Sequence, residues 1–342
     1  MDARVAAVWF REGEQQVRAG DLKRAIESFR KATSNDSDNR QYVIALANAL
    51  AAAGHDEEAR QALLRLRETS PENAQINLYL ARLAAKRGDV AETTRYYENA
   101  LYGLWTGTQV DEERRKVRVE LIRFLLDHHQ RSGALSEALV LGTESPLDDP
   151  GAQTEAGQLL LEAGDAQHAL KYFMRVIALN RTNAVALAGA GNAAFQLGNY
   201  VEARRYLEAA LAQGLESESA LQLLTVSKMI LSHDPLESYL RREERSKRLV
   251  ADFEQSLRRL QSCLGQQSAK KDSPSLETLE ADAMEIQGKL QPKNLQQDPE
   301  LLRAGMELIC KIEEATRNSC GDPVALDRAL LLVCRKHSGA LQ

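Results

Sequence analysis

The sequence predicts an all-α chain built as an array of helix–turn–helix units. Small and aromatic residues recur together along it with a period of about 34 residues, which is typical of such arrays. The composition also favours helices, because Ala, Leu, Glu, Gln and Arg are abundant and aromatic residues make up only 5%. Each unit of an array contacts only its neighbours, so the 342 residues need not divide into separate globular domains. We identify no strand in the sequence.

The first unit covers residues 6–39 and shows the pattern most clearly. Its pattern residues are Trp9, Gly13, Gly20, Asp21, Ala25, Phe29 and Ala32. The small residues allow two helices to cross closely, and the aromatic residues fill the space between them. The second unit (40–73) and the third (74–107) follow without a gap and keep small and large residues in the same register.

The pattern weakens in the middle of the chain. Residues 102–109 form an insertion containing Trp105, which we interpret either as packing within the irregular array or as a contact for a partner. The fourth unit (112–148) is degenerate, because Gly142 stands where an aromatic residue is expected, and its second helix is predicted to be short. The fifth and sixth units restore the pattern, the sixth over 184–217.

Residues 6–217 resemble the tetratricopeptide repeat family, since several pattern positions recur together at the period of that family. The resemblance implies a right-handed α-solenoid whose concave groove is lined mainly by the first helix of each unit. It also implies a non-enzymatic role in holding peptides or assembling protein complexes. The compact, alanine-rich style of the units is similar to that of bacterial arrays.

Cap and proline signals organise the chain into four segments. We expect a solenoid of about six units and a terminal helix over 1–234, closed by a long charged helix over 235–264 with Asp234 as its N-cap. The polar stretch 265–275 is predicted to be a linker, and 276–342 a C-terminal helical region.

The resemblance also implies which residues line the groove, from their positions in the first helix of each unit. They are Phe10, Glu14, Gln41, Asn48, Leu78, Arg82, Lys86, Arg123, Asp127, Gln158, Asn192 and Gln196. Some family members hold the C-terminal carboxylate of a peptide in a clamp of lysine, asparagine and arginine. Asn48, Arg82 and Lys86 match part of that clamp. Phe10 and Glu14 stand where it needs a lysine and an asparagine, so we favour a general polar groove.

The four cysteines, Cys263, Cys310, Cys320 and Cys334, all lie in the last quarter of the chain. None forms a C-x-x-C pair, which argues against a zinc site. A reducing compartment would keep them as buried thiols, which we favour, and an oxidising one would allow one or two disulfides. If a disulfide forms, Cys263 and Cys320 are the expected pair, because both follow the end of a predicted helix.

No motif predicts catalysis, a cofactor or a metal site. Residues 189–194 satisfy G-x-G-x-x-A, but they lie inside a predicted helix and not after a strand, so they indicate close packing and not a nucleotide. The net charge of −5 argues against a nucleic-acid partner. The basic residues within 241–259 alternate with acidic ones, which favours a solvated helix.

We therefore predict a scaffold that binds a protein or peptide partner, in the assembly of an envelope or secretion complex. No apolar run is long enough to cross a bilayer, so we expect no membrane insertion by this segment. The alternative is a regulatory or substrate-presenting region of a larger enzyme or membrane-anchored protein, because the first unit begins almost at the start of the chain. On that alternative an anchor would lie upstream. The cytoplasmic and periplasmic sides of a bacterial envelope both remain open.

Overall fold

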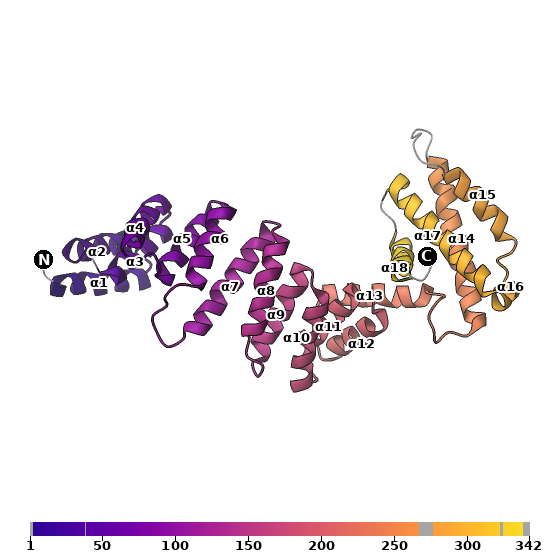
Figure 1. The fold of residues 1–342 in the computed structure, drawn as a ribbon, viewed down its shortest axis with the longest axis horizontal. Coiled ribbons are helices and arrows are strands. Elements are labelled where there is room, and N and C mark those ends of the chain that lie inside the picture. Colours follow the sequence, from indigo (N-terminus) through magenta and orange to yellow (C-terminus); the bar gives the residue numbers. More distant parts are fainter. Residues whose placement is uncertain (1–2, 38, 267–275, 322–323, 338–342) are drawn as a thin grey trace. The chain divides into compact units, whose positions relative to one another are not determined.

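The computed structural model describes residues 3–37, 39–266, 276–321 and 324–337. These residues form eighteen α-helices and no strand, apart from one isolated bridge between Asn73 and Leu104 (Figure 1). The predicted all-α solenoid is confirmed. The chain divides into two compact units, Met1–Asp165 and Ala166–Gln342. From here on these are called the first unit and the second unit, and each repeat of the sequence is called a helix pair. None of the helices in the described part of the chain is long and apolar enough to cross a membrane.

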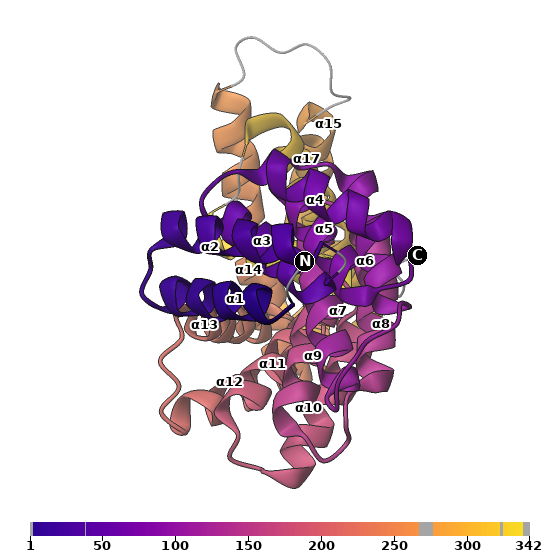
Figure 2. The ribbon, with the colours of Figure 1, turned by 90° about the vertical axis from the view of Figure 1, so that its left-hand side faces the viewer.

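The first unit is a stack of antiparallel helix pairs (Figures 1 and 2). Its helices are α1 (Ala3–Arg18), α2 (Leu22–Asn35), α3 (Arg40–Ala52), α4 (Asp56–Thr69), α5 (Ala74–Lys86), α6 (Val90–Leu101), α7 (Val110–Asp127), α8 (Arg131–Glu144) and α9 (Pro150–Ala163). Each helix contacts the next one along the chain, while α3 also contacts α5, and α7 also contacts α9. Because α3 touches α5 and α7 touches α9, we treat the first helices of the pairs (α1, α3, α5, α7 and α9) as lining one common face, which we call the inner face.

Side chains and glycine set the ends of these helices. The carboxylate of Asp21 accepts a hydrogen bond from the backbone N–H of Arg24 at 3.1 Å, and Asn73 Oδ1 accepts one from Ile76 at 3.0 Å. These bonds satisfy backbone donors that have no partner inside the helix. Gly88 sits between α5 and α6 with a φ of 71°, a left-handed conformation that favours glycine. The turn positions of the sequence pattern therefore have a direct backbone cause.

The glycine and aromatic positions of the pattern meet inside the helix pairs. A Cβ atom on Gly13 of α1 would lie 2.5 Å from the ring of Phe29 on α2, so only glycine lets the two helices pack this closely. The rings of Phe10 and Phe29 have centroids 5.7 Å apart, and those of Phe10 and Tyr42 are 4.7 Å apart. These aromatic contacts join the first helix pair to the second.

The degenerate fourth pair is held by a buried cation. Arg118 of α7 is 3% exposed and forms ion pairs with Glu137 and Glu144 of α8. This pairing accounts for a second helix of ordinary length, 14 residues, where a short one was predicted. The insertion before α7 folds back as well: the N–H of Leu104 donates to the carbonyl of Glu72 at 2.7 Å.

Trp105 of the insertion is half-buried, and its indole N–H donates to the carbonyl of Ala100 at 2.9 Å. This contact supports the packing interpretation of Trp105.

The second unit continues the repeats and then changes character. Its helices are α10 (Ala166–Leu179), α11 (Ala184–Gln196), α12 (Tyr200–Ala212), α13 (Glu218–His233), α14 (Arg242–Gln266), α15 (Leu276–Gln287), α16 (Pro292–Gln297), α17 (Pro299–Cys320) and α18 (Ala325–His337). The short α16 was not predicted. Helices α14 to α18 pack around a shared apolar core that includes Leu249, Phe253, Met306 and Ile309. Two disulfides join these helices, Cys263–Cys320 and Cys310–Cys334.

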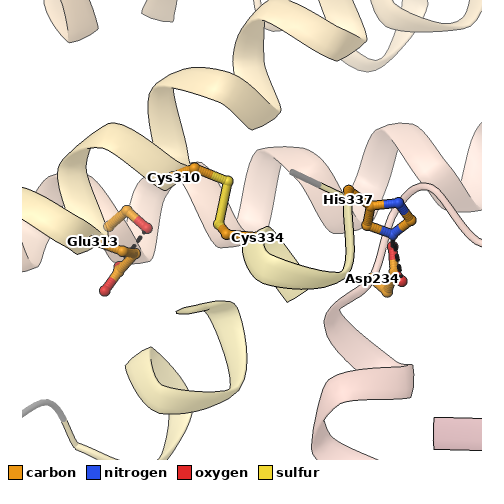
Figure 3. Close-up of a disulfide and its surroundings, with 6 residues drawn as sticks. Asp234, Cys310, Glu313, Cys334 and His337 are labelled. Carbon is orange, nitrogen blue, oxygen red and sulfur yellow. Dashed lines mark hydrogen bonds and ion pairs between the residues drawn. A yellow bond between two sulfur atoms is a disulfide. The ribbon is translucent and has the colours of Figure 1, made fainter. Parts of the chain in front are cut away.

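The long charged helix begins later than predicted, and most of the predicted linker lies outside the described residues. Asp234 does not open the long charged helix, because residues 234–241 form turns and α14 begins only at Arg242. The Asp234 carboxylate bonds to His337 of α18, as Figure 3 shows, and also to Lys336 of the same helix. The predicted linker 265–275 lies outside the described residues except for its first two positions, which end α14.

Candidate partner-binding surface

Ion pairs link the first helices of neighbouring pairs across the inner face of the first unit. Arg82 of α5 forms two hydrogen bonds with the carboxylate of Glu120 on α7, at 2.9 and 2.7 Å. Arg123 of α7 pairs with Glu155 of α9 at 3.2 Å. Since Arg82, Arg123 and Glu155 are each more than one-third exposed, these pairs stabilise the stack only weakly and are open to exchange with a ligand.

A cavity of about 450 Å³ lies between α7 and the start of α9. It is lined by Glu112, Arg115, Lys116, Val119, Glu120, Arg123, Asp149, Gly151, Ala152 and Glu155. Arg115 lies 3.9 Å from Asp149, and Lys116 lies 2.9 Å from Glu112. The cavity therefore presents alternating positive and negative groups and not a field of one sign.

The buried Tyr97 contacts Glu120, one of the charged residues of this surface. The hydroxyl of Tyr97 on α6 donates to Glu120 at 3.2 Å. Burial and the adjacent Glu120 carboxylate hold the pKa of Tyr97 well above its ordinary value, so the hydroxyl stays protonated and remains a donor. The hydrogen bond to Glu120 also raises the pKa of Arg82, which remains a cation. Glu120 is thus positioned from both neighbouring helices.

The structure buries two of the predicted groove residues. Phe10 is 9% exposed and packs against aromatic rings, and Leu78 is 5% exposed in the core of the α5–α6 pair. Their side chains offer almost no surface to a ligand, so we exclude both from the surface. For Phe10 the reason is that it packs between Phe29 of its own helix pair and Tyr42 of the next pair.

The other predicted groove residues are at least partly accessible. Glu14, Asn48 and Asn192 are half-buried; the exposed ones are Gln41, Arg82, Lys86, Arg123, Asp127, Gln158 and Gln196. Asn192 and Gln196 lie on α11 of the second unit and bond to each other at 3.2 Å. The residues that match part of a carboxylate clamp already have acidic partners, since Arg82 pairs with Glu120 and Lys86 pairs with Asp56 at 2.8 Å.

Sequence reasoning missed the acidic partners Glu120 and Glu155. Glu120 lies on the same helix as the predicted Arg123, and Glu155 lies on the same helix as the predicted Gln158. Their signal is the charge of opposite sign that they place on the next first helix, opposite Arg82 and Arg123.

Among the described residues, no group of three or more His, Cys, Asp or Glu side chains could hold a metal ion. The G-x-G-x-x-A segment lies inside α11, where a Cβ atom on Gly189 would come within 2.5 Å of the Phe173 ring and one on Gly191 within 2.6 Å of Leu207. These glycines permit helix packing.

Two segments of the chain match the tetratricopeptide repeat family. The family model described as "Tetratricopeptide repeat" matches residues 16–83 and 160–226, which overlap the helix pairs at the start of each compact unit. No curated protein sequence matches the chain significantly.

Several solved structures are similar to this chain in fold. YrrB, "a TPR protein with an unusual peptide-binding site", is 21% identical with a TM-score of 0.45, over 58% of this chain and 97% of that chain. PilW, a type IV pilus biogenesis factor, is 20% identical with a TM-score of 0.43, over 64% of this chain and 98% of that chain. A tetratricopeptide repeat protein from Parabacteroides merdae ATCC 43184 is 12% identical with a TM-score of 0.43, over 96% of this chain and 99% of that chain.

Proposed function

We propose that the protein is a non-enzymatic scaffold whose first unit holds a polypeptide segment of a partner on the inner face of α5, α7 and α9. The observation that supports this most is the cavity between α7 and α9, which is large enough for several side chains and is lined by charged groups on helices of the inner face. Tetratricopeptide repeats commonly present such a face to peptides.

The paired charges indicate what this face recognises. A bound segment with charges of both signs can replace an internal pair such as Arg123–Glu155 by two intermolecular pairs without leaving a charge unmatched. Because these groups are exposed, added salt should slow association and weaken binding. A purely apolar segment would find little to contact here, since Val119 and Ala152 are the larger apolar contributors to the cavity.

The finer part of the proposal is a role in assembling an envelope or secretion complex outside the reducing cytosol. It is supported by the two disulfides of the second unit, because structural disulfides persist mainly in oxidising compartments. Thiol trapping with a maleimide, started from intact cells, tests it. After acid quenching and unfolding in denaturant, all four cysteines should remain unlabelled until a reductant is added, whereas four thiols labelled without reductant would contradict the extracytoplasmic role.

Capture from native cells tests the binding face. The double variant Arg123→Ala, Glu155→Ala removes an inner-face pair, and Arg30→Ala, Glu58→Ala removes a similarly exposed pair between the second helices α2 and α4. We expect the inner-face variant to lower recovery of a specific co-purified protein by at least about fivefold, equivalent to about 1 kcal/mol of binding free energy. The control variant should leave recovery unchanged. Equal losses in both variants would count against the inner face.

A further inference from the structure

Helix α18 contacts α13. In the second unit, α11 and α13 are the first helices of their repeats, and we call the face that they form the inner face of the second unit. Helices α11 and α13 touch each other directly, as the first helices of the first unit do. Helix α18 is the C-terminal helix of the described chain and lies against both α13 and α17. It thus connects the last repeat helices to the C-terminal helices.

The contact is apolar at a position where earlier helix pairs are polar. Val226 of α13 lies one repeat period after Asn192 of α11, and Asn192 lies one period after Gln158, so all three hold the same repeat position. Met229 of α13 lies one period after Phe195 of α11, so that position is apolar in both helices. At α13 an apolar residue thus replaces the polar one at the first of these positions, and the apolar character of the second is kept.

The C-terminal helices cover this apolar surface. Phe195, Val226 and Met229 are partly buried against the same core cluster to which Ala329 and Val333 of α18 contribute, and both of these α18 residues are fully buried. Ala329 and Val333 are four residues apart and share one face of α18. An amphipathic helix laid against a helical groove uses this arrangement of anchors.

Charge completes the docking at the end of α18. Asp234, directly after α13, is 0% exposed, and its carboxylate accepts a hydrogen bond from His337 at 2.9 Å (Figure 3). The carboxylate also accepts one from Lys336 at 2.9 Å. Lys336 also pairs with Glu237. A buried carboxylate is costly without a cation, so Asp234 selects a helix that brings a lysine to this point.

A covalent bond then holds α18 in place. The Cys310–Cys334 disulfide ties it to α17, and Figure 3 shows this bond one turn from the contact between His337 and Asp234. The bond keeps α18 at a high effective concentration beside α13, so a competing helix is excluded while it is closed.

We propose that the inner face of α11 and α13 is a receptor for an amphipathic helix, and that α18 occupies it as an internal ligand. The accepted helix carries apolar residues at i and i+4 and a lysine at i+7, as at Ala329, Val333 and Lys336. A partner helix with this pattern replaces α18 once the Cys310–Cys334 disulfide is opened. A dithiol opens it by exchange: it leaves as its own disulfide, and Cys310 and Cys334 become thiols.

The probe is a fluorescent synthetic peptide of residues 324–337 with Ser at position 334, added to the full-length chain. The receiving variant is Cys310→Ser, Cys334→Ser, Val333→Asp, which opens the disulfide and weakens the docking of its own α18 but leaves α11 and α13 intact. Anisotropy should show binding at least about tenfold tighter than to the oxidised wild type, because the internal competitor is removed. The same peptide carrying Asp at position 333 should not bind.

Hydrogen exchange on the wild-type chain gives a second reading that does not depend on the variant. After reduction by dithiothreitol, residues 325–337 should lose protection while α11 and α13 keep theirs. Absence of peptide binding to a variant that keeps its repeat helices, or full protection of α18 after reduction, would overturn the proposal. Neither reading depends on a partner at the inner face of the first unit.

Discussion

Arg82 on α5 and Glu120 on α7 form a two-point ion pair, and the hydroxyl of Tyr97 donates to the same carboxylate. The pair spans neighbouring repeats, so it couples their packing. A double-mutant cycle of Arg82→Ala and Glu120→Ala should give a coupling free energy of about 0.5–1 kcal/mol, because both side chains are partly exposed. Urea unfolding measures it. A coupling of zero would show that the pair contributes nothing to the stack.

Arg118 should matter far more than any surface arginine. Removing its buried guanidinium with Arg118→Ala leaves Glu137 and Glu144 without their shared cation, and we expect a loss of about 2–4 kcal/mol in the free energy of unfolding. The control Arg24→Ala removes an exposed arginine, and its effect should stay below about 0.5 kcal/mol. Similar effects of the two changes would contradict the account of the fourth pair.

Replacing Gly189 or Gly133 by alanine should have different effects on stability, because only Gly189 is in a tight packing contact. Gly189→Ala should destabilise the second unit by about 1–3 kcal/mol, because the new methyl group meets the fully buried ring of Phe173. Gly133→Ala on α8 should be neutral or stabilise by up to about 1 kcal/mol, because its nearest neighbour would be an ordinary contact with Leu125 at 3.4 Å. Thermal unfolding of both variants checks the contrast. A Gly189→Ala protein as stable as the wild type would contradict the claim that Gly189 is needed for close packing against Phe173.

The buried carboxyl group of Glu313 should make the free energy of unfolding fall as the pH rises toward 7. Its carboxyl on α17 is 0% exposed, and burial raises its pKa to about 7 despite hydrogen bonds from Ser256 and Arg259. A raised pKa means that the folded chain binds the proton more tightly than the unfolded chain. The contribution of Glu313 to stability is therefore fully present below the ordinary glutamate pKa and is lost as pH rises to about 7.

The substitution Glu313→Gln isolates that contribution. It should remove part of the stability loss between about pH 5 and about pH 8, a difference on the order of 2 kcal/mol. Comparing the two proteins is necessary because Asp234 acts in the opposite direction: burial alone would raise its pKa, but His337 and Lys336 lower it, so its contribution is lost only in acid. Parallel pH profiles for wild type and Glu313→Gln would contradict the assignment.

The repeat architecture was predictable because its causes are local or periodic. Gly13 faces Phe29 between α1 and α2, and the same sequence separation, in the opposite direction, relates Gly189 of α11 to Phe173 of α10. Such spacings can be read directly from the chain. The boundaries of the helices in regular units follow from the same glycine and cap positions.

The features that were missed depend on contacts between distant segments. Asp234 has the local pattern of an N-cap before proline, yet its partners lie 102 and 103 residues away on α18. Glu120 and Glu155 were missed because their role comes from pairing with Arg82 and Arg123 on neighbouring helices, a contact that the repeat positions of a single helix do not describe. The Cys310–Cys334 disulfide joins two helices whose relative position no local pattern describes.

Site-specific photo-crosslinking tests the central claim most directly, which is that a partner segment lies on the inner face of the first unit. A photoreactive residue is placed at Gln158 on α9, and at Gln61 on α4 as a matched exposed glutamine on a second helix. We predict that Gln158 crosslinks to one continuous segment of one partner protein in the native cells and that Gln61 does not. Crosslinks of equal yield from Gln61, or none from Gln158, would contradict the account.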